Sequence, residues 1–199
     1  MMPLENSWVN EIDLPINLTL WRGFISSEEA TKYFNALIQR PEPVQGTIQL
    51  FGKTYKTPRL EALYGEKNLR YSYSNQEIQA IPLCPLIAKL KREVEKKTQH
   101  NFNCVFVNVY RNGMDSNGWH ADNEKELGQD PIIASLSFGE RRKFLLKSNK
   151  GNQKISLELD HGDLLLMGSG IQNKWKHCVP KSKKVMAPRI NLTFRKIMV

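Results

Sequence analysis

The sequence predicts a mainly β fold with flanking helices, and three observations support this prediction. The 199 residues include 40% hydrophobic side chains, which is typical of one globular domain able to bury its own core. Two amphipathic helical patterns occur within the first hundred residues. After residue 100, short and often alternating apolar runs are separated by Gly, Asn and Pro. This order is typical of an antiparallel sandwich or barrel on helical supports, and we expect a jelly roll.

The two helices are predicted from their start and stop signals. Ser26 followed by Glu29 forms a capping box, and apolar residues then recur at helical spacing until the helix ends before Pro41. The second helix begins near Pro85, a residue type favoured in a first helical turn, and runs to about Thr98. We expect both helices to pack against a sheet.

The strands are predicted in the second half of the chain. We expect a single domain over residues 1–199, in which 1–100 give helical support and 101–199 form the jelly-roll core. The predicted strands cover residues 102–110, 132–138, 143–147, 155–159, 164–167 and 190–194.

Charge and cysteine content restrict the function classes. Lys and Arg number 29 against 20 Asp and Glu, and the net charge of +9 favours polyanions such as nucleic acid or an acidic membrane surface. The three cysteines are widely separated and include no CxxC, which indicates neither disulfides nor a thiolate zinc site. No apolar run approaches the roughly 20 residues of a membrane span, and the polar N-terminus is unlike a signal peptide. We expect a cytoplasmic or nucleoid protein, or a nuclear one in a eukaryote.

A candidate metal site comes from three residues. His120 and Asp122 alternate with one residue between them, so on extended backbone their side chains point the same way, and His177 can add a third ligand. Two imidazoles and a carboxylate on one face of an octahedral ion leave positions open, as non-haem Fe(II) oxygenases require. The alternative is a surface His beside a solvated Asp.

The last predicted strand has one polar face. Four polar residues there would require an anionic ligand, such as a dicarboxylate, if they faced a barrel interior. The alternative is an exposed edge strand with a polar outer face. Asn108 and Tyr110 share a face of an earlier strand and could hydrogen-bond carboxylate oxygens. The four residues of the last strand are Arg189, Asn191, Thr193 and Arg195.

These segments resemble the AlkB-type Fe(II) and 2-oxoglutarate-dependent dioxygenases, most closely the animal homologue 2-like branch that repairs double-stranded DNA. The similarity covers most of residues 45–196. The shared segments are N-V-Y-R-N-G at 108–113, W-H-A-D-N-E at 119–124, P-I-I-A-S-L-S-F-G at 131–139, the distal His177, and A-P-R-I-N-L-T-F-R at 187–195.

The resemblance implies a double-stranded β-helix (jelly roll) core of the 2-oxoglutarate oxygenase type and a set of ligands. Fe(II) would be held by His120, Asp122 and His177, and dioxygen would be the oxidant. The cosubstrate 2-oxoglutarate would be bound by a second set, comprising Asn108, Tyr110, Arg189, Asn191, Thr193 and Arg195. The reaction implied is oxidative decarboxylation coupled to hydroxylation of an N-methyl group, which then leaves as formaldehyde.

The branch further implies that a damaged base is flipped out of a duplex. Phe51, with Gly52 at a turn and Lys53 beside it, resembles a finger that fills the gap left by the flipped base. From the pattern alone, this segment is equally a strand end that packs into the core. Residues 1–100 would then include a nucleotide-recognition lid.

A base pocket is implied by the spacing of Arg59, Tyr71 and Tyr73, with Glu124 reading an exocyclic amine. The alternative for the two tyrosines is a β-hairpin with cross-strand aromatic residues. The chain departs from the branch at Asn123, where the branch has an acid, and at Tyr73, where it has Phe, so base preference stays open.

Basic residues near the C-terminus are expected to neutralise phosphates. Lys183 and Lys184 lie on a predicted loop, and Arg142 is expected to join them. The alternative is a solvated basic loop.

The sequence thus predicts a monomeric oxidative dealkylase of 1-methyladenine and 3-methylcytosine. Its partner would be alkylated DNA, with duplex preferred and single strands possible, and it would have no membrane partner. The alternatives are demethylation of RNA or of a protein by the same chemistry, and a non-catalytic nucleic-acid-binding protein with the same fold.

Overall fold

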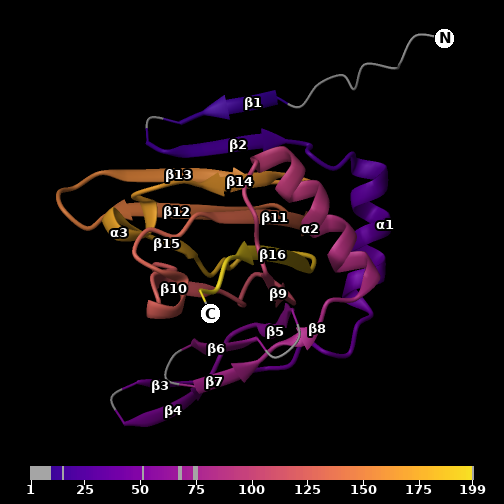
Figure 1. Ribbon diagram of the computed structural model, residues 1–199, viewed down its shortest axis with the longest axis horizontal. Coiled ribbons are helices and arrows are strands. Elements are labelled where there is room, and N and C mark those ends of the chain that lie inside the picture. The colour runs from indigo at the N-terminus through magenta and orange to yellow at the C-terminus, as the bar shows by residue number, and fades with distance from the viewer. Residues whose placement is uncertain (1–9, 15, 51, 67–68, 74–75, 199) are drawn as a thin grey trace.

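The computed structural model describes residues 10–14, 16–50, 52–66, 69–73 and 76–198. Two large sheets form the centre of the molecule (Figure 1). The larger sheet has the order β1-β2-β14-β11-β16-β9-β5-β8. Its strands are β1 (Asn10–Asp13), β2 (Leu18–Arg22), β5 (Leu60–Gly65), β8 (Ile81–Pro82), β9 (Cys104–Tyr110), β11 (Ile133–Gly139), β14 (Leu164–Met167) and β16 (Arg189–Arg195).

The smaller sheet has the order β10-β15-β12-β13 and packs against one face of the larger sheet through a shared apolar core. In that core Phe144 and Leu146 of the smaller sheet meet Phe106 and Leu165 of the larger one. Two sheets packed face to face, antiparallel except where β5 pairs with β8, are the jelly-roll arrangement that the sequence predicts. The strands of the smaller sheet are β10 (Asn117–His120), β12 (Arg142–Ser148), β13 (Lys154–Leu159) and β15 (Trp175–Val179).

Both predicted helices are present and cover the other face of the larger sheet (Figure 1). The helix α1 (Ser27–Ile38) is capped by the Ser26 hydroxyl, which accepts the Glu29 N–H at 3.4 Å. The helix α2 (Pro85–Thr98) begins with Pro85 and ends at Gln99, whose backbone is left-handed. None of the helices in the described residues is long and apolar enough to cross a bilayer.

The alternation of β16 places its two kinds of side chain on opposite sides of the sheet. Ile190, Leu192 and Phe194 belong to the core beneath the helices, whereas Arg189 and Arg195 line a cavity between the sheets. The polar face of this strand is therefore interior, and the alternative of an exposed edge strand is wrong because β16 lies between β11 and β9.

All six predicted strands are present, but the first hundred residues contain more than helices. Strands β1, β2, β5 and β8 from this region join the larger sheet, so the main sheet is not confined to residues 101–199. Two hairpins also lie here, formed by β3 (Thr47–Leu50) with β4 (Lys53–Lys56) and by β6 (Arg70–Tyr73) with β7 (Gln76–Gln79). Figure 1 shows the β3–β4 hairpin at one end of the molecule.

Candidate metal centre and dicarboxylate site

The structure brings His120, Asp122 and His177 together. One ligand atom from each lies within 4.8 Å of the other two. The two histidines are direct cross-strand partners, because β10 pairs with β15 at this position, and their ring centroids are 4.2 Å apart. Asp122 follows two residues after His120, where β10 has ended. The two imidazoles and the carboxylate thus converge on one point.

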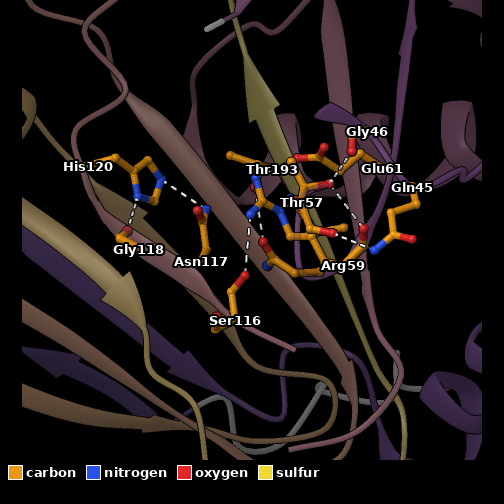
Figure 2. A network of polar contacts seen from close by, with 12 residues as sticks. Gln45, Gly46, Thr57, Arg59, Glu61, Ser116, Asn117, Gly118, His120 and Thr193 are labelled. Atoms are coloured by element: carbon orange, nitrogen blue, oxygen red, sulfur yellow. Dashed lines mark hydrogen bonds and ion pairs between the residues drawn. The ribbon is translucent and has the colours of Figure 1, made fainter. Parts of the chain in front are cut away.

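The tautomer of His120 follows from its hydrogen bond to the main chain (Figure 2). Its Nδ1 lies 2.8 Å from the Gly118 carbonyl oxygen and must donate there. Nε2 is therefore the atom with a lone pair. It lies 3.6 Å from Asp122 Oδ1 and accepts from Asn117 Nδ2 at 3.2 Å. A metal ion at Nε2 would take the place of that amide contact.

Burial keeps His177 neutral. Its ring is 4% exposed and stacks on Phe144 at 5.2 Å between centroids. Burial, with a smaller effect from nearby His120, lowers the pKa of His177 to about 3. A neutral imidazole has the free lone pair that a metal ligand needs.

Asp122 is held in its ionised form. Burial disfavours the charge, but Arg195 and both imidazoles outweigh this effect and hold the pKa of Asp122 below its usual range. Arg195 Nη2 lies 3.0 Å from Asp122 Oδ1. The donor set is therefore one carboxylate and two neutral imidazoles, which suits Fe(II).

A buried cation lies in the same cavity. Arg189 is 1% exposed, and its Nη2 donates to Ser137 Oγ at 3.0 Å. Its Nε and Nη1 have no hydrogen-bond partner among the described residues. Burial lowers the pKa of Arg189 to about 10, and its guanidinium carbon lies 5.2 Å from the centre of the Tyr110 ring. A buried guanidinium with two unused donor atoms requires an anion.

The other polar residues of β16 are engaged within the protein. Asn191 donates to Ser135 Oγ at 2.8 Å and to the Leu136 carbonyl at 3.1 Å, while Thr193 donates to Asn191 Oδ1 at 3.0 Å. All line the same cavity as Arg189. They fix the shape of the cavity wall.

Arg59 is buried and hydrogen-bonded to a residue of the cavity wall, and it is not exposed as a base-contacting residue would be. It is 4% exposed, and its Nε donates to Asn108 Oδ1 at 2.8 Å. It also donates to Glu61 Oε1 at 2.5 Å and to the Ser116 carbonyl at 3.3 Å (Figure 2). Arg59 therefore orients an amide of the predicted dicarboxylate site, Asn108.

Arg142 is not where the sequence analysis expected it. It is 3% exposed and donates to the main-chain carbonyls of Asn112, Asp115 and Pro180 at 3.2, 2.8 and 2.7 Å. Arg142 shares the inward face of β12 with Phe144 and lines a second cavity together with Lys184, and its contact with phosphate stays a prediction. It fastens two loops at the end of the barrel.

None of the other predicted substrate residues that the structure describes lines the cavity. Gly52 has φ +75° at the turn of the β3–β4 hairpin, and Lys53 is exposed. Phe51 lies outside the described residues. Tyr71 and Tyr73 lie on β6, but their side chains are outside the description. Among the remaining residues, Asn123 is exposed, Glu124 is half-buried, and Lys183 and Lys184 are exposed on the loop before β16.

Several residues at the site escaped the sequence analysis. Phe144, Met167 and Ser135 line the cavity, and Gln172 accepts the Asp122 N–H at 2.9 Å. Ser135 could have been found, because Ser135 and Ser137 alternate with apolar residues along β11. Gln172 gave no signal, since its contact with Asp122 spans fifty positions of the chain.

Three comparisons agree with this geometry. The model of the 2OG-Fe(II) oxygenase superfamily matches residues 17–195. Alpha-ketoglutarate-dependent dioxygenase alkB homolog 3 of Bos taurus is 39% identical over 208 residues, covering 98% of this chain and 72% of that protein. DNA oxidative demethylase ALKBH2 of Mus musculus is 39% identical over 181 residues, covering 85% of this chain and 76% of that protein.

A solved structure, that of OsALKBH1, has the same fold, with a TM-score of 0.68 at 16% identity over 94% of this chain and 99% of that one. Fold and site define a dioxygenase that uses Fe(II), 2-oxoglutarate and dioxygen. The chain belongs to the 2OG-Fe(II) oxygenase superfamily and, within it, to the AlkB-type dioxygenases.

Proposed function

We propose that this protein is an oxidative demethylase that removes methyl groups from 1-methyladenine and 3-methylcytosine, preferentially in duplex DNA after base flipping. The observation that carries the proposal is a single cavity that contains both a His-Asp-His cluster and a buried arginine with unused donors. The similarity to a DNA oxidative demethylase supports the choice of substrate.

The residues of the cavity fit the two groups that the family requires. His120, Asp122 and His177 would hold Fe(II) through Nε2, a carboxylate oxygen and a neutral imidazole. Arg189 would bind the far carboxylate of 2-oxoglutarate through its unused Nε and Nη1, because these donors have no partner among the described residues. Asn108 and Tyr110 line the same cavity and would add hydrogen bonds.

When bound, Fe(II) and 2-oxoglutarate would activate dioxygen, the oxidant that hydroxylates an N-methyl carbon, after which formaldehyde would leave the base. The residues of the chain orient the proposed metal ligands and shield them from water. Arg195 holds the Asp122 carboxylate at 3.0 Å, and Phe144 covers the face of His177. The protein's task is to bring the methyl carbon to this buried point and to exclude water from it.

The β3–β4 hairpin would deliver the base to the site. Its base is fastened where Gln45 Nε2 donates to the Thr57 carbonyl at 2.9 Å and the Thr57 hydroxyl donates to the Arg59 carbonyl at 3.2 Å (Figure 2). Phe51 and Gly52 at its turn would fill the gap in the duplex, with Lys53 near a phosphate. Tyr71, Tyr73, Asn123 and Glu124 would contact the flipped base.

Basic side chains support a nucleic-acid partner. Lys183 and Lys184 are exposed, as expected for phosphate contacts. A second group crosses the outer face of the smaller sheet, where Lys147 is the cross-strand partner of both Lys154 and Lys176. Lys147 Nζ also lies 4.5 Å from the ring centre of Trp119, which is 41% exposed. Adjacent like charges repel one another, so this row favours a polyanion.

The remaining assignments belong to the same proposal. Within residues 1–100, the two hairpins would act as the nucleotide-recognition lid on the core of residues 101–199. The protein would act as a monomer, in the cytoplasm or nucleoid of a bacterium or the nucleus of a eukaryote.

The experiment that tests the function is mass spectrometry of oligonucleotides containing 1-methyladenine or 3-methylcytosine after incubation with the protein, Fe(II) and 2-oxoglutarate. We expect loss of the methyl mass from DNA, faster in duplexes than in single strands, and no loss with His120→Ala. Faster turnover of methylated RNA would contradict the DNA assignment. Failure to consume 2-oxoglutarate with any of these substrates would favour a non-catalytic nucleic-acid-binding protein.

A further inference from the structure

Gln172 is a fully buried amide next to the metal site. It lies in the short helix α3 (Ile171–Lys174), three residues before β15 and five before His177, and its side chain is 0% exposed. Burying an amide costs free energy unless its polar atoms are bonded. Among the described residues its Nε2 finds a weak sulfur acceptor, Met167 Sδ at 3.5 Å, whereas its Oε1 accepts the Asp122 N–H at 2.9 Å. The bond to Asp122 is therefore the strong one.

The backbone of Asp122 needs this partner. Strand β10 ends at His120, so Asp122 is beyond the ladder that pairs β10 with β15. A buried N–H outside a ladder must find another acceptor. The Gln172 side chain supplies it and thereby fixes the backbone from which the Asp122 carboxylate projects.

The loop that begins at Asp122 covers residues 122–130, and its other end is also hydrogen-bonded to α3 and its cap. Gly170 N–H donates to Asp130 Oδ1 at 2.6 Å, and Asn173 Nδ2 donates to the Gln129 carbonyl at 2.8 Å. Residues 122–130 are thus attached to α3 at both ends, and α3 leads directly into the strand that carries His177. The loop, α3 and His177 form one connected unit.

We infer that Gln172 is a positioning residue for the metal site: its Oε1 holds the Asp122 backbone so that the carboxylate meets the same ion as His120 and His177. The inference rests on the ligand assignment made under the proposed function. Hydrogen-bonding partners of metal ligands typically change metal affinity by about 10–100-fold when removed. Gln172 acts through Asp122 and does not itself touch the metal.

The test measures Mn²⁺ affinity by electron paramagnetic resonance of the free ion, with no turnover needed. Gln172→Leu and Gln172→Met both remove the acceptor, and we expect each to weaken Mn²⁺ binding by about 10–100-fold. Gln172→Glu should bind Mn²⁺ nearly as tightly as the unaltered chain. A glutamate at this position keeps a carboxyl oxygen as acceptor for the Asp122 N–H.

Asn173→Ala is the matched control, because it loosens α3 without touching Asp122. Thermal unfolding of the metal-free variants reports their stability separately. Mn²⁺ affinity in Gln172→Leu and Gln172→Met equal to that of Asn173→Ala would overturn the inference, as would failure of both Gln172 variants to fold. Unchanged Mn²⁺ affinity in His120→Ala would instead overturn the ligand assignment.

Discussion

At the scale of single residues, the site depends on charges that are buried and then satisfied. Asp122 is 1% exposed and keeps its charge because Arg195 lies 3.0 Å away. Arg189 is as deeply buried, and its Nη2 donates to the Ser137 hydroxyl, whereas its Nε and Nη1 have no hydrogen-bond partner among the described residues. Burying a guanidinium in this way costs free energy, because the charge loses its hydration. Binding of an anion offsets that cost, so the cavity should favour an anionic ligand.

Ser137 should therefore matter for cosubstrate binding. Ser137→Ala removes the bond that orients Arg189, and one such bond is worth about 0.5–1.5 kcal/mol, or roughly 2–10-fold. We expect KM for 2-oxoglutarate to rise by that factor with little change in kcat, measured as succinate formed at increasing 2-oxoglutarate. Ser148→Ala is the control, because Ser148 donates to the Lys150 carbonyl and does not line the cavity. Equal KM changes in both variants would contradict the role given to Ser137.

At the scale of elements, β16 and the β3–β4 hairpin differ in position and in the role that we assign to each. Strand β16 is central, and its alternation separates a core face from a face that lines the cavity. The hairpin lies at one end of the molecule, and at its base the Thr57 hydroxyl donates to the Arg59 carbonyl (Figures 1 and 2). The strand lines the cavity, and the hairpin is the part that we propose contacts a duplex.

Phe51→Ala tests the hairpin. If Phe51 fills the gap left by a flipped base, its loss should slow demethylation of duplex substrate more than of single-stranded substrate, because a single strand needs no unpairing. Side-by-side rates on the two forms of one oligonucleotide measure this. Tyr55→Ala, on the same hairpin and 48% exposed, is the control. Equal slowing on duplex and single-stranded substrate would show that Phe51 does not fill the gap left by a flipped base.

At the scale of the whole molecule, alternation and capping predicted both helices, the six strands and the polar face of β16. Other parts depend on contacts that no local pattern contains. Strand β5 has the sequence L-E-A-L-Y-G, which suits a helix as well as a strand and is fixed as a strand by pairing with β9. The sequence suggests that Arg142 is a surface cation, but in the structure Arg142 is buried on the same face of β12 as Phe144. Gln172 meets Asp122 because β10 pairs with β15 in the smaller sheet, a pairing that no local pattern predicts.

The net charge of +9 is also a property of the whole molecule, and part of it should be used on nucleic acid. In a Lys147→Ala/Lys176→Ala double variant, we expect weaker DNA binding and a slope of log K against log salt reduced by about 1–2. Fluorescence anisotropy across a salt series measures both quantities. The control is Lys89→Ala/Lys96→Ala on α2, which lies against the opposite face of the larger sheet. The same change of slope in the control would show that the effect is one of net charge alone.

The central claim is that one cavity holds a metal ion at His120, Asp122 and His177 and a dicarboxylate at Arg189. Calorimetric titration of 2-oxoglutarate into the Mn²⁺-loaded protein tests it most directly, with Arg189→Met compared under the same conditions. We expect one 2-oxoglutarate to bind per chain, and we expect this binding to require Mn²⁺. In Arg189→Met the affinity for 2-oxoglutarate should fall at least about 10-fold, the loss expected for a charge-assisted contact. Equal binding by Arg189→Met, or binding that needs no metal, would contradict it.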